Sequence, residues 1–299
     1  MNILGVKLSK QHMVTSIIKV ILILMFGFVA IAGGLLVGKM IIGKFDTFDP
    51  SKYTAENYIE NPQNIVLWSS KNISELTPTQ IFCIAESKIL KNEHYSIKTK
   101  GYNGEDKGFV LTLGGMKQDL YGYRYRKDGK GYFDYFSTGL AKVAKKVEYT
   151  FGEDKYYCYE GSINGDTTTW NIKKQQESGN EFFTADEYKA MTGCNAENPI
   201  DYIVSIKTVL SEQTNEKVGA LYSYTIILDT KTSVLNYVKK MKYMSNFGYP
   251  KFNSIELRFE VDENMNFQNI YISESYKVIG MDANSKYKME FNYGDFEIR

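Results

Sequence analysis

The chain has 299 residues, with 36 Lys and Arg against 35 Asp and Glu, and a formal net charge of +1. This balance gives no overall field that would attract nucleic acid, so we expect no nucleic-acid binding. With only two histidines and no Cys-x-x-Cys spacing among the three cysteines, the sequence also predicts no histidine triad, no zinc site, no catalytic residue and no cofactor.

The first notable feature is an uncharged apolar run from Val20 to Gly38. At roughly 1.5 Å per residue, a helix of this length spans about 30 Å, the thickness of the hydrocarbon core of a bilayer. We therefore predict a short cytoplasmic tail at 1–16 and a single-pass transmembrane signal-anchor at 17–43. A short tail before the span and a large domain after it favour an extracytoplasmic location for that domain, in the cell membrane of a bacterial envelope.

A cleaved secretory signal peptide is the alternative for this segment, because Ala30-Ile31-Ala32 fits the small-x-small cleavage pattern. Cleavage there falls inside the apolar run, since Leu35, Leu36 and Val37 follow, and this favours an uncleaved anchor. Ala30, Gly34 and Gly38 place three small residues on one helix face, which predicts a possible homodimer through close helix packing.

Residues 44–76 are polar and irregular and are expected to form a stalk, with a folded extracytoplasmic domain at 77–299. The domain opens on "TPTQIFCIAESKIL", where Thr77 and Gln80 form a capping box and Pro78 stands at the first helical position. Apolar residues at helical spacing follow. This stretch is predicted as an amphipathic helix.

After this helix the apolar period changes to two. Tight-turn signals stand at Asn103-Gly104, Asp128-Gly129 and Asn164-Gly165, which indicates hairpins between sequence neighbours. Alternation recurs near the end of the chain, at 255–261 and 287–293. The pattern predicts a long antiparallel sheet of ten or eleven strands with one dry face.

Two or three helices are expected to cover that dry face. Thr184 and Glu187 form a second capping box, Asn198-Pro199 is expected to start a helix, and Thr232 or Ser233 is expected to cap a third. The predicted apolar residues of the last two helices are Ile203, Ile206 and Leu210, and Val234, Val238 and Met241. The predicted fold class is α+β.

Three cysteines cannot all pair within one chain. Cys158 and Cys194 could form a disulfide in an oxidising exterior, which leaves Cys83 free. The alternative, which we favour, is three buried thiols.

The order of these elements, from "TPTQIFCIAESKIL" through Tyr-rich hairpins to helices and a final meander, resembles the periplasmic lipoprotein-carrier superfamily, LolA-like proteins and their mycobacterial LppX-like relatives. The resemblance covers about residues 77–296. It implies a half-open antiparallel β-barrel whose concave side holds helices and an apolar cavity for acyl chains. A retained membrane anchor departs from that family, because a tethered protein cannot shuttle across an envelope.

One polar residue breaks the apolar pattern of a strand. Glu274 lies in the sequence Ile270, Ile272, Glu274, Tyr276, Val278, among residues of the dry face. A carboxyl group there must find a partner or stay protonated. It is predicted either as a polar anchor in a ligand cavity, together with Tyr276, Phe259 and Phe291, or as a structural residue that lies at a rim or bonds to a buried tyrosine or a helix end.

The leading functional prediction is a membrane-anchored extracytoplasmic module that binds a lipid or acyl chain. The alternative is a cell-surface scaffold that binds wall polymer or another membrane protein, for which outward-facing Tyr222 and Tyr224 would suit stacking on sugars. A hydrolase built on scattered carboxylates is a third hypothesis.

Overall fold

The computed structural model describes residues 48–104, 118–138, 142–176, 178–245, 248–278 and 281–298. The predicted tail and signal-anchor, and with them Ala30, Gly34 and Gly38, lie outside these ranges. Within the ranges, none of the helices combines the length and the apolar character needed to cross a membrane.

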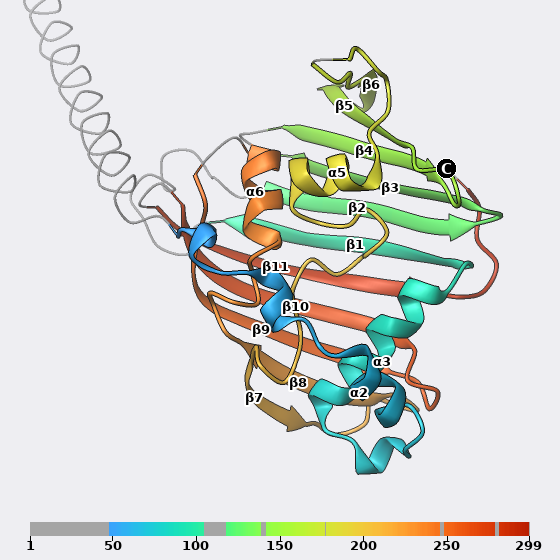
Figure 1. Ribbon diagram of the computed structural model, residues 1–299, viewed down its shortest axis with the longest axis vertical. Helices are drawn as coiled ribbons and strands as arrows, with labels where there is room; N and C mark the ends of the chain where they lie inside the picture. Colours follow the sequence, from blue (N-terminus) through green and yellow to red (C-terminus); the bar gives the residue numbers. More distant parts are fainter. Residues whose placement is uncertain are drawn as a thin grey trace, which may run out of the picture.

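A single open antiparallel sheet of eleven strands dominates the described chain, in the order β6-β5-β4-β3-β2-β1-β11-β10-β9-β8-β7 (Figure 1). Two meanders therefore lie side by side, and the first and last strands pair where they meet. The strands are β1 Tyr95–Gly104, β2 Gln118–Lys127, β3 Lys130–Thr138, β4 Val143–Thr150, β5 Tyr156–Asn164, β6 Thr167–Ile172, β7 Val209–Thr214, β8 Tyr222–Leu228, β9 Lys251–Val261, β10 Phe267–Val278 and β11 Met281–Asn292.

The helices gather on one face of this sheet, α2 and α3 toward the β7 edge and α5 and α6 over the other half (Figure 1). They are η1 Pro50–Lys52, η2 Ala55–Tyr58, α2 Pro62–Trp68, η3 Ile73–Glu75, α3 Pro78–Lys91, α5 Ala185–Thr192 and α6 Tyr237–Ser245. The capping boxes predicted for Thr77 with Gln80 and for Thr184 with Glu187 are both confirmed.

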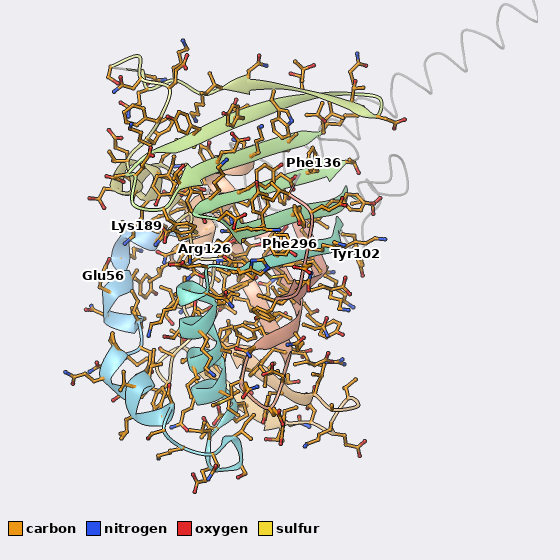
Figure 2. All side chains as sticks on the ribbon, turned by 90° about the vertical axis from the view of Figure 1, so that its right-hand side faces the viewer. Glu56, Tyr102, Arg126, Phe136, Lys189 and Phe296 are labelled. Carbon is orange, nitrogen blue, oxygen red and sulfur yellow. The ribbon has the colours of Figure 1, made fainter. Side chains whose placement is uncertain are left out.

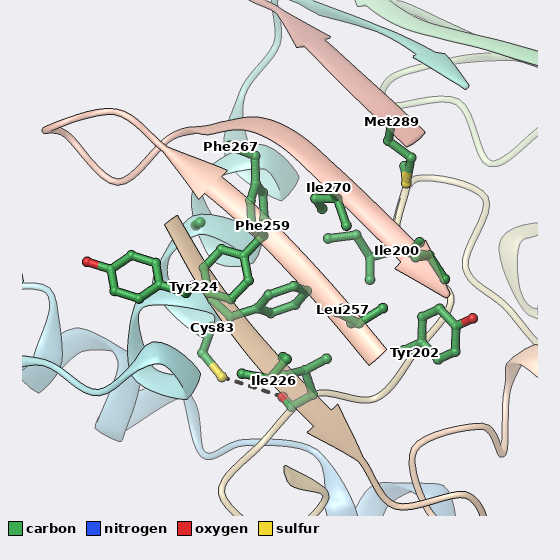
Figure 3. Close-up of a cluster of buried hydrophobic side chains, with 14 of the residues drawn as sticks. Cys83, Ile200, Tyr202, Tyr224, Ile226, Leu257, Phe259, Phe267, Ile270 and Met289 are labelled. Carbon is green, nitrogen blue, oxygen red and sulfur yellow. Dashed lines mark hydrogen bonds between the residues drawn. The ribbon is translucent and has the colours of Figure 1, made fainter. Parts of the chain in front are cut away.

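The main core lies between α3 and the half of the sheet made by β8 to β11 (Figure 3). Phe82 on α3 is fully buried, and its ring centroid lies 5.2 Å from that of Phe259 and 5.1 Å from that of Phe267. These edge-to-face contacts add to the burial of apolar surface, which is the main source of stability here.

Strand β2 turns its arginines, not its tyrosines, toward the helices. Arg124 Nη1 donates to the Ala196 carbonyl at 2.6 Å, and Arg126 Nη1 donates to the Leu90 carbonyl at 2.7 Å. The opposite face carries Tyr102 and Phe136, on the side away from the helices (Figure 2). The predicted turn at Asp128-Gly129 is confirmed, with positive φ at both residues.

Two segments differ from the prediction. Residues 48–76, expected as a stalk, form η1, η2, α2 and η3, and Trp68 and Leu76 belong to the buried core. The helix predicted from Asn198-Pro199 is wrong, because residues 199–208 form turns and irregular backbone. Ile206 and Leu210, predicted on its apolar face, are 57% and 66% exposed.

The structure contains no disulfide between the three cysteines, which are all free and buried. The favoured interpretation as buried thiols is confirmed. Burial raises the pKa of the Cys158 thiol to about 12, so this thiol stays protonated and unreactive at neutral pH.

Candidate ligand-binding cavity

A cavity of about 590 Å³ lies on the helix-covered face of the sheet. Its walls come from β1 to β5 and from β9 to β11 on one side, and from α5, α6 and the segment 199–202 on the other. Volumes of about 300–1,000 Å³ are typical of small-molecule sites. The dry face is thus packed solid under α3 and hollow under α6.

The floor of the cavity is apolar. It consists of strand side chains that also belong to the main core, namely Ile97, Leu257, Ile270, Ile272 and Met289, and Phe82 of α3 also lines the cavity. Ile200, Tyr202 and Met289 belong both to the core and to the cavity wall (Figure 3). An apolar ligand group therefore meets hydrocarbon on this side.

Tyrosines and one carboxyl group form a polar cluster at the α6 side. The Tyr202 hydroxyl donates to Glu274 Oε2, and the Tyr237 hydroxyl donates to Glu274 Oε1 at 3.1 Å. The hydroxyls of Tyr202 and Tyr287 lie 3.4 Å apart. These residues come from the segment before β7, from α6, from β10 and from β11, so the cluster joins the cover to the sheet.

Glu274 is 3% exposed. Burial raises the pKa of its carboxyl to about 7, although hydrogen bonds from Tyr202, Tyr237 and Ser285 lower it. The carboxyl group is therefore partly protonated near neutral pH, and both of its oxygens accept hydrogen bonds from the tyrosines.

An ion pair lies beside this cluster. Lys240 on α6 donates from Nζ to Asp201 Oδ2 at 2.6 Å, and both residues line the cavity. The other oxygen, Asp201 Oδ1, is buried and accepts from no N–H or O–H group of the described residues, while the Cys194 thiol also bonds to this carboxyl group. A buried acceptor without an N–H or O–H donor is costly, so this oxygen marks a place where a ligand donor would stabilise the protein.

The remaining cations of the cavity wall already donate to protein oxygens. Lys145 Nζ lies 3.3 Å from Glu160 Oε1, and Lys146 Nζ lies 2.8 Å from Glu148 Oε1. Arg124 is held by the Ala196 carbonyl. The described walls therefore offer hydroxyls and a spare acceptor, whereas their lysines are paired with carboxylates.

The four residues predicted as ligand contacts separate into three positions. Tyr276 lines the cavity, and its hydroxyl accepts from Asn103 Nδ2 at 2.7 Å. Glu274 lies one layer behind, covered by its tyrosine partners. Phe259 and Phe291 both contact Phe267 in the packed core and are absent from the cavity wall.

The sequence-based prediction of ligand contacts did not include four residues of the cavity wall, Tyr202, Tyr237, Asp201 and Lys240. One signal was available, because Tyr237 and Lys240 are three residues apart and share a helix face. The predicted sugar-stacking pair also lies elsewhere than expected. Tyr224 is buried against Phe259, and Tyr222 packs on the same core.

Comparison with known proteins gives no relative from which a function could be inferred. No family model matches the chain, and no curated protein matches it. Among solved structures, a crystal structure of an N-terminal dehydratase from the difficidin assembly line aligns at a TM-score of 0.12 with 5% identity. That alignment covers 74% of this chain and 83% of the other, and so low a score supports no argument about fold or function.

Proposed function

We propose that this protein is a membrane-anchored extracytoplasmic module that binds a lipid or acyl chain under a half-barrel-like sheet. The observation that carries the proposal is the cavity of about 590 Å³ with an apolar floor and a polar cluster at one side. Its mixed walls suit an amphiphile, because the floor meets the chain and the hydroxyls meet the head.

The apolar run at 20–38 supports the location, since a chain tethered there meets its ligand at the bilayer itself. A tethered binder accepts, presents or senses a lipid instead of carrying it across an envelope. The scaffold alternative has less support, because Tyr222 and Tyr224 pack inward.

Photo-crosslinking in cells tests the proposal. Cells that express the full chain are fed a long-chain fatty acid with a diazirine in the chain, which enters their lipids, and are then irradiated. We expect labelled peptides from the cavity wall, such as those that contain Tyr237 and Tyr287. Labelling confined to residues 17–43, or no labelling, contradicts the proposal.

A matched pair of variants sharpens this experiment. Ala283→Trp places an indole in the cavity, whereas Lys286→Trp places the same group on the exposed face of the same strand. We expect Ala283→Trp to lose cavity labelling and Lys286→Trp to keep it. Equal labelling of the two variants argues that the lipid lies outside the cavity.

A further inference from the structure

The chemistry of the polar cluster restricts the head of the ligand. A fatty-acid carboxylate or a phosphate needs a free cation or free N–H donors. The lysines of the wall, Lys145, Lys146 and Lys240, each pair with a carboxylate, whereas Arg124 donates from Nη1 to the neutral Ala196 carbonyl. An anionic head would also meet Asp201 and the carboxyl group of Glu274.

A cationic head is disfavoured for the opposite reason. The Lys240 ammonium occupies one oxygen of Asp201 and repels a second positive charge there. The Glu274 carboxyl is covered by Tyr202 and Tyr237, which already donate to both of its oxygens, so an added ammonium finds no open oxygen on this group.

Hydroxyl groups fit what remains. Asp201 Oδ1 is a buried acceptor that no described N–H or O–H group reaches, and an alcohol supplies a stronger donor than the Cys194 thiol beside this carboxyl group. The hydroxyls of Tyr135 and Tyr287 line the same cavity, and each can donate or accept. Tyr135 lies close enough to Glu274 for that carboxyl group to contribute to the raised pKa of its phenol.

We propose that the polar end of the cavity binds an uncharged, hydroxyl-bearing head of the monoacylglycerol class, with a hydroxyl donating to Asp201 Oδ1. This inference rests on the proposed function, since it assumes that an acyl chain occupies the apolar floor. Asp201 and Tyr287 select the head, and the floor holds the chain.

Three photoactivatable probes with the same diazirine-bearing chain separate the head groups. They are a 1-monoacylglycerol, the free fatty acid and the primary alkylamine, each mixed at the same low fraction into phosphatidylcholine nanodiscs that contain the full-length protein. At pH 7.5 we expect the monoacylglycerol to label the cavity peptides about tenfold more than either charged probe, which corresponds to about 1.4 kcal/mol.

Asp201→Asn tests the assigned oxygen through a change of preference. The variant leaves the Lys240 ammonium without its carboxylate, so monoacylglycerol labelling falls and fatty-acid labelling rises. Glu181→Gln is the control, because it removes the partner of Lys174 in an exposed ion pair outside the cavity. We expect this variant to keep the wild-type preference.

The possible failures are distinguishable. Stronger or equal labelling by the fatty acid or the alkylamine in the wild-type protein overturns the head-group assignment and leaves lipid binding standing. An unchanged preference in Asp201→Asn overturns the role of that oxygen. If none of the three probes labels the cavity peptides, lipid binding itself fails, and the head-group assignment with it.

Discussion

Glu274 shows how a residue that breaks a local pattern can mark a site without defining it. Its position among apolar neighbours on β10 is visible in the sequence. Its partners Tyr202 and Tyr237 are 72 and 37 residues away, and only the packing of α6 and the 199–202 segment brings them to it. The sequence therefore predicted that Glu274 needs a hydrogen-bond partner, but it did not show that Tyr202 and Tyr237 are the partners.

The raised pKa of Glu274 predicts a pH dependence of stability. Its value in the folded state is about 7 against the ordinary 4.5, so the folded protein holds a proton that the unfolded chain releases between these values. The free energy of unfolding therefore falls as the pH rises through this window, by up to about 3 kcal/mol from this group. We expect Glu274→Gln to remove that part of the loss, which urea unfolding from pH 4.5 to 8 measures.

Two comparisons make this prediction specific. Burial also raises the pKa of the Glu86 carboxyl to about 7, so Glu86→Gln is expected to remove a second, separate part of the loss. Glu181→Gln, at an exposed glutamate, controls for the substitution itself. A Glu274→Gln protein with the same pH slope as the wild type would show that Glu274 ionises normally in the fold.

At the scale of elements, most local signals were confirmed, but the tight turn predicted at Asn103-Gly104 is wrong, because both residues pair with β11 inside β1. The box of Thr77 and Gln80, by contrast, fixes the start of α3 within four residues. A second kind of failure arises where side chains compete with the backbone. The stretch after Asn198 has apolar residues at helical spacing, but Asn198 Oδ1 accepts from the Ile200 amide and Thr208 Oγ1 accepts from the Ser205 amide. Such local bonds hold the chain in turns and prevent a helix.

Helices α5 and α6, which cover the cavity, contact each other at Gly193, so a substitution there is expected to lower the stability of the fold. Gly193 ends α5 with a φ of 81°, and a Cβ there would lie 2.4 Å from Lys239 Cβ and 2.8 Å from the Asn236 carbonyl oxygen. Gly193→Ala therefore combines backbone strain with a clash against α6. We expect a loss of about 2–4 kcal/mol in the free energy of unfolding, from strain of about 1–2 kcal/mol and overpacking of about 1–3 kcal/mol.

Gly179 is the matched control for that variant. Its φ is 71°, and a Cβ there would meet nothing within 4 Å. Gly179→Ala should therefore show the strain without the clash, a loss of about 1–2 kcal/mol. Equal losses for the two alanine variants, measured by urea unfolding, would mean that α5 and α6 can separate at little cost.

On the scale of the whole molecule, the sheet joins a packed half to a hollow half. Hairpin signals and alternation predicted about the right number of antiparallel strands, because hairpins between sequence neighbours depend on turn residues and apolar alternation within short segments. The cavity could not be predicted in this way. It arises where α6 and the 199–202 segment hold a cover above strands that carry Gly122 and Ala283, and that spacing is a property of the assembled layers.

The ladder between β1 and β11 is the only described strand pairing that links the two meanders. A substitution at Gly101 in this ladder therefore tests how far the stability of the protein depends on it. Gly101 faces Tyr287, and a Cβ there would lie 2.3 Å from Tyr287 Cβ and 2.3 Å from the Lys286 carbonyl oxygen. Gly101→Ala forces the ladder apart, with an expected loss of about 1–3 kcal/mol. Because Tyr287 belongs to the cavity wall, the same variant should weaken lipid labelling.

Gly122 provides the control on the neighbouring strand β2. A Cβ at Gly122 would approach the Asp134 carbonyl oxygen to 3.2 Å and reach no other described atom more closely. We expect Gly122→Ala to change the free energy of unfolding by no more than about 1 kcal/mol.

Urea unfolding followed by fluorescence and by circular dichroism should give one coincident transition in the wild type, since a shared ladder and core make the meanders a single cooperative unit. Two separate transitions in the wild type, or equal losses in the two variants, would show that the meanders fold independently and that the ladder between them carries little of the stability.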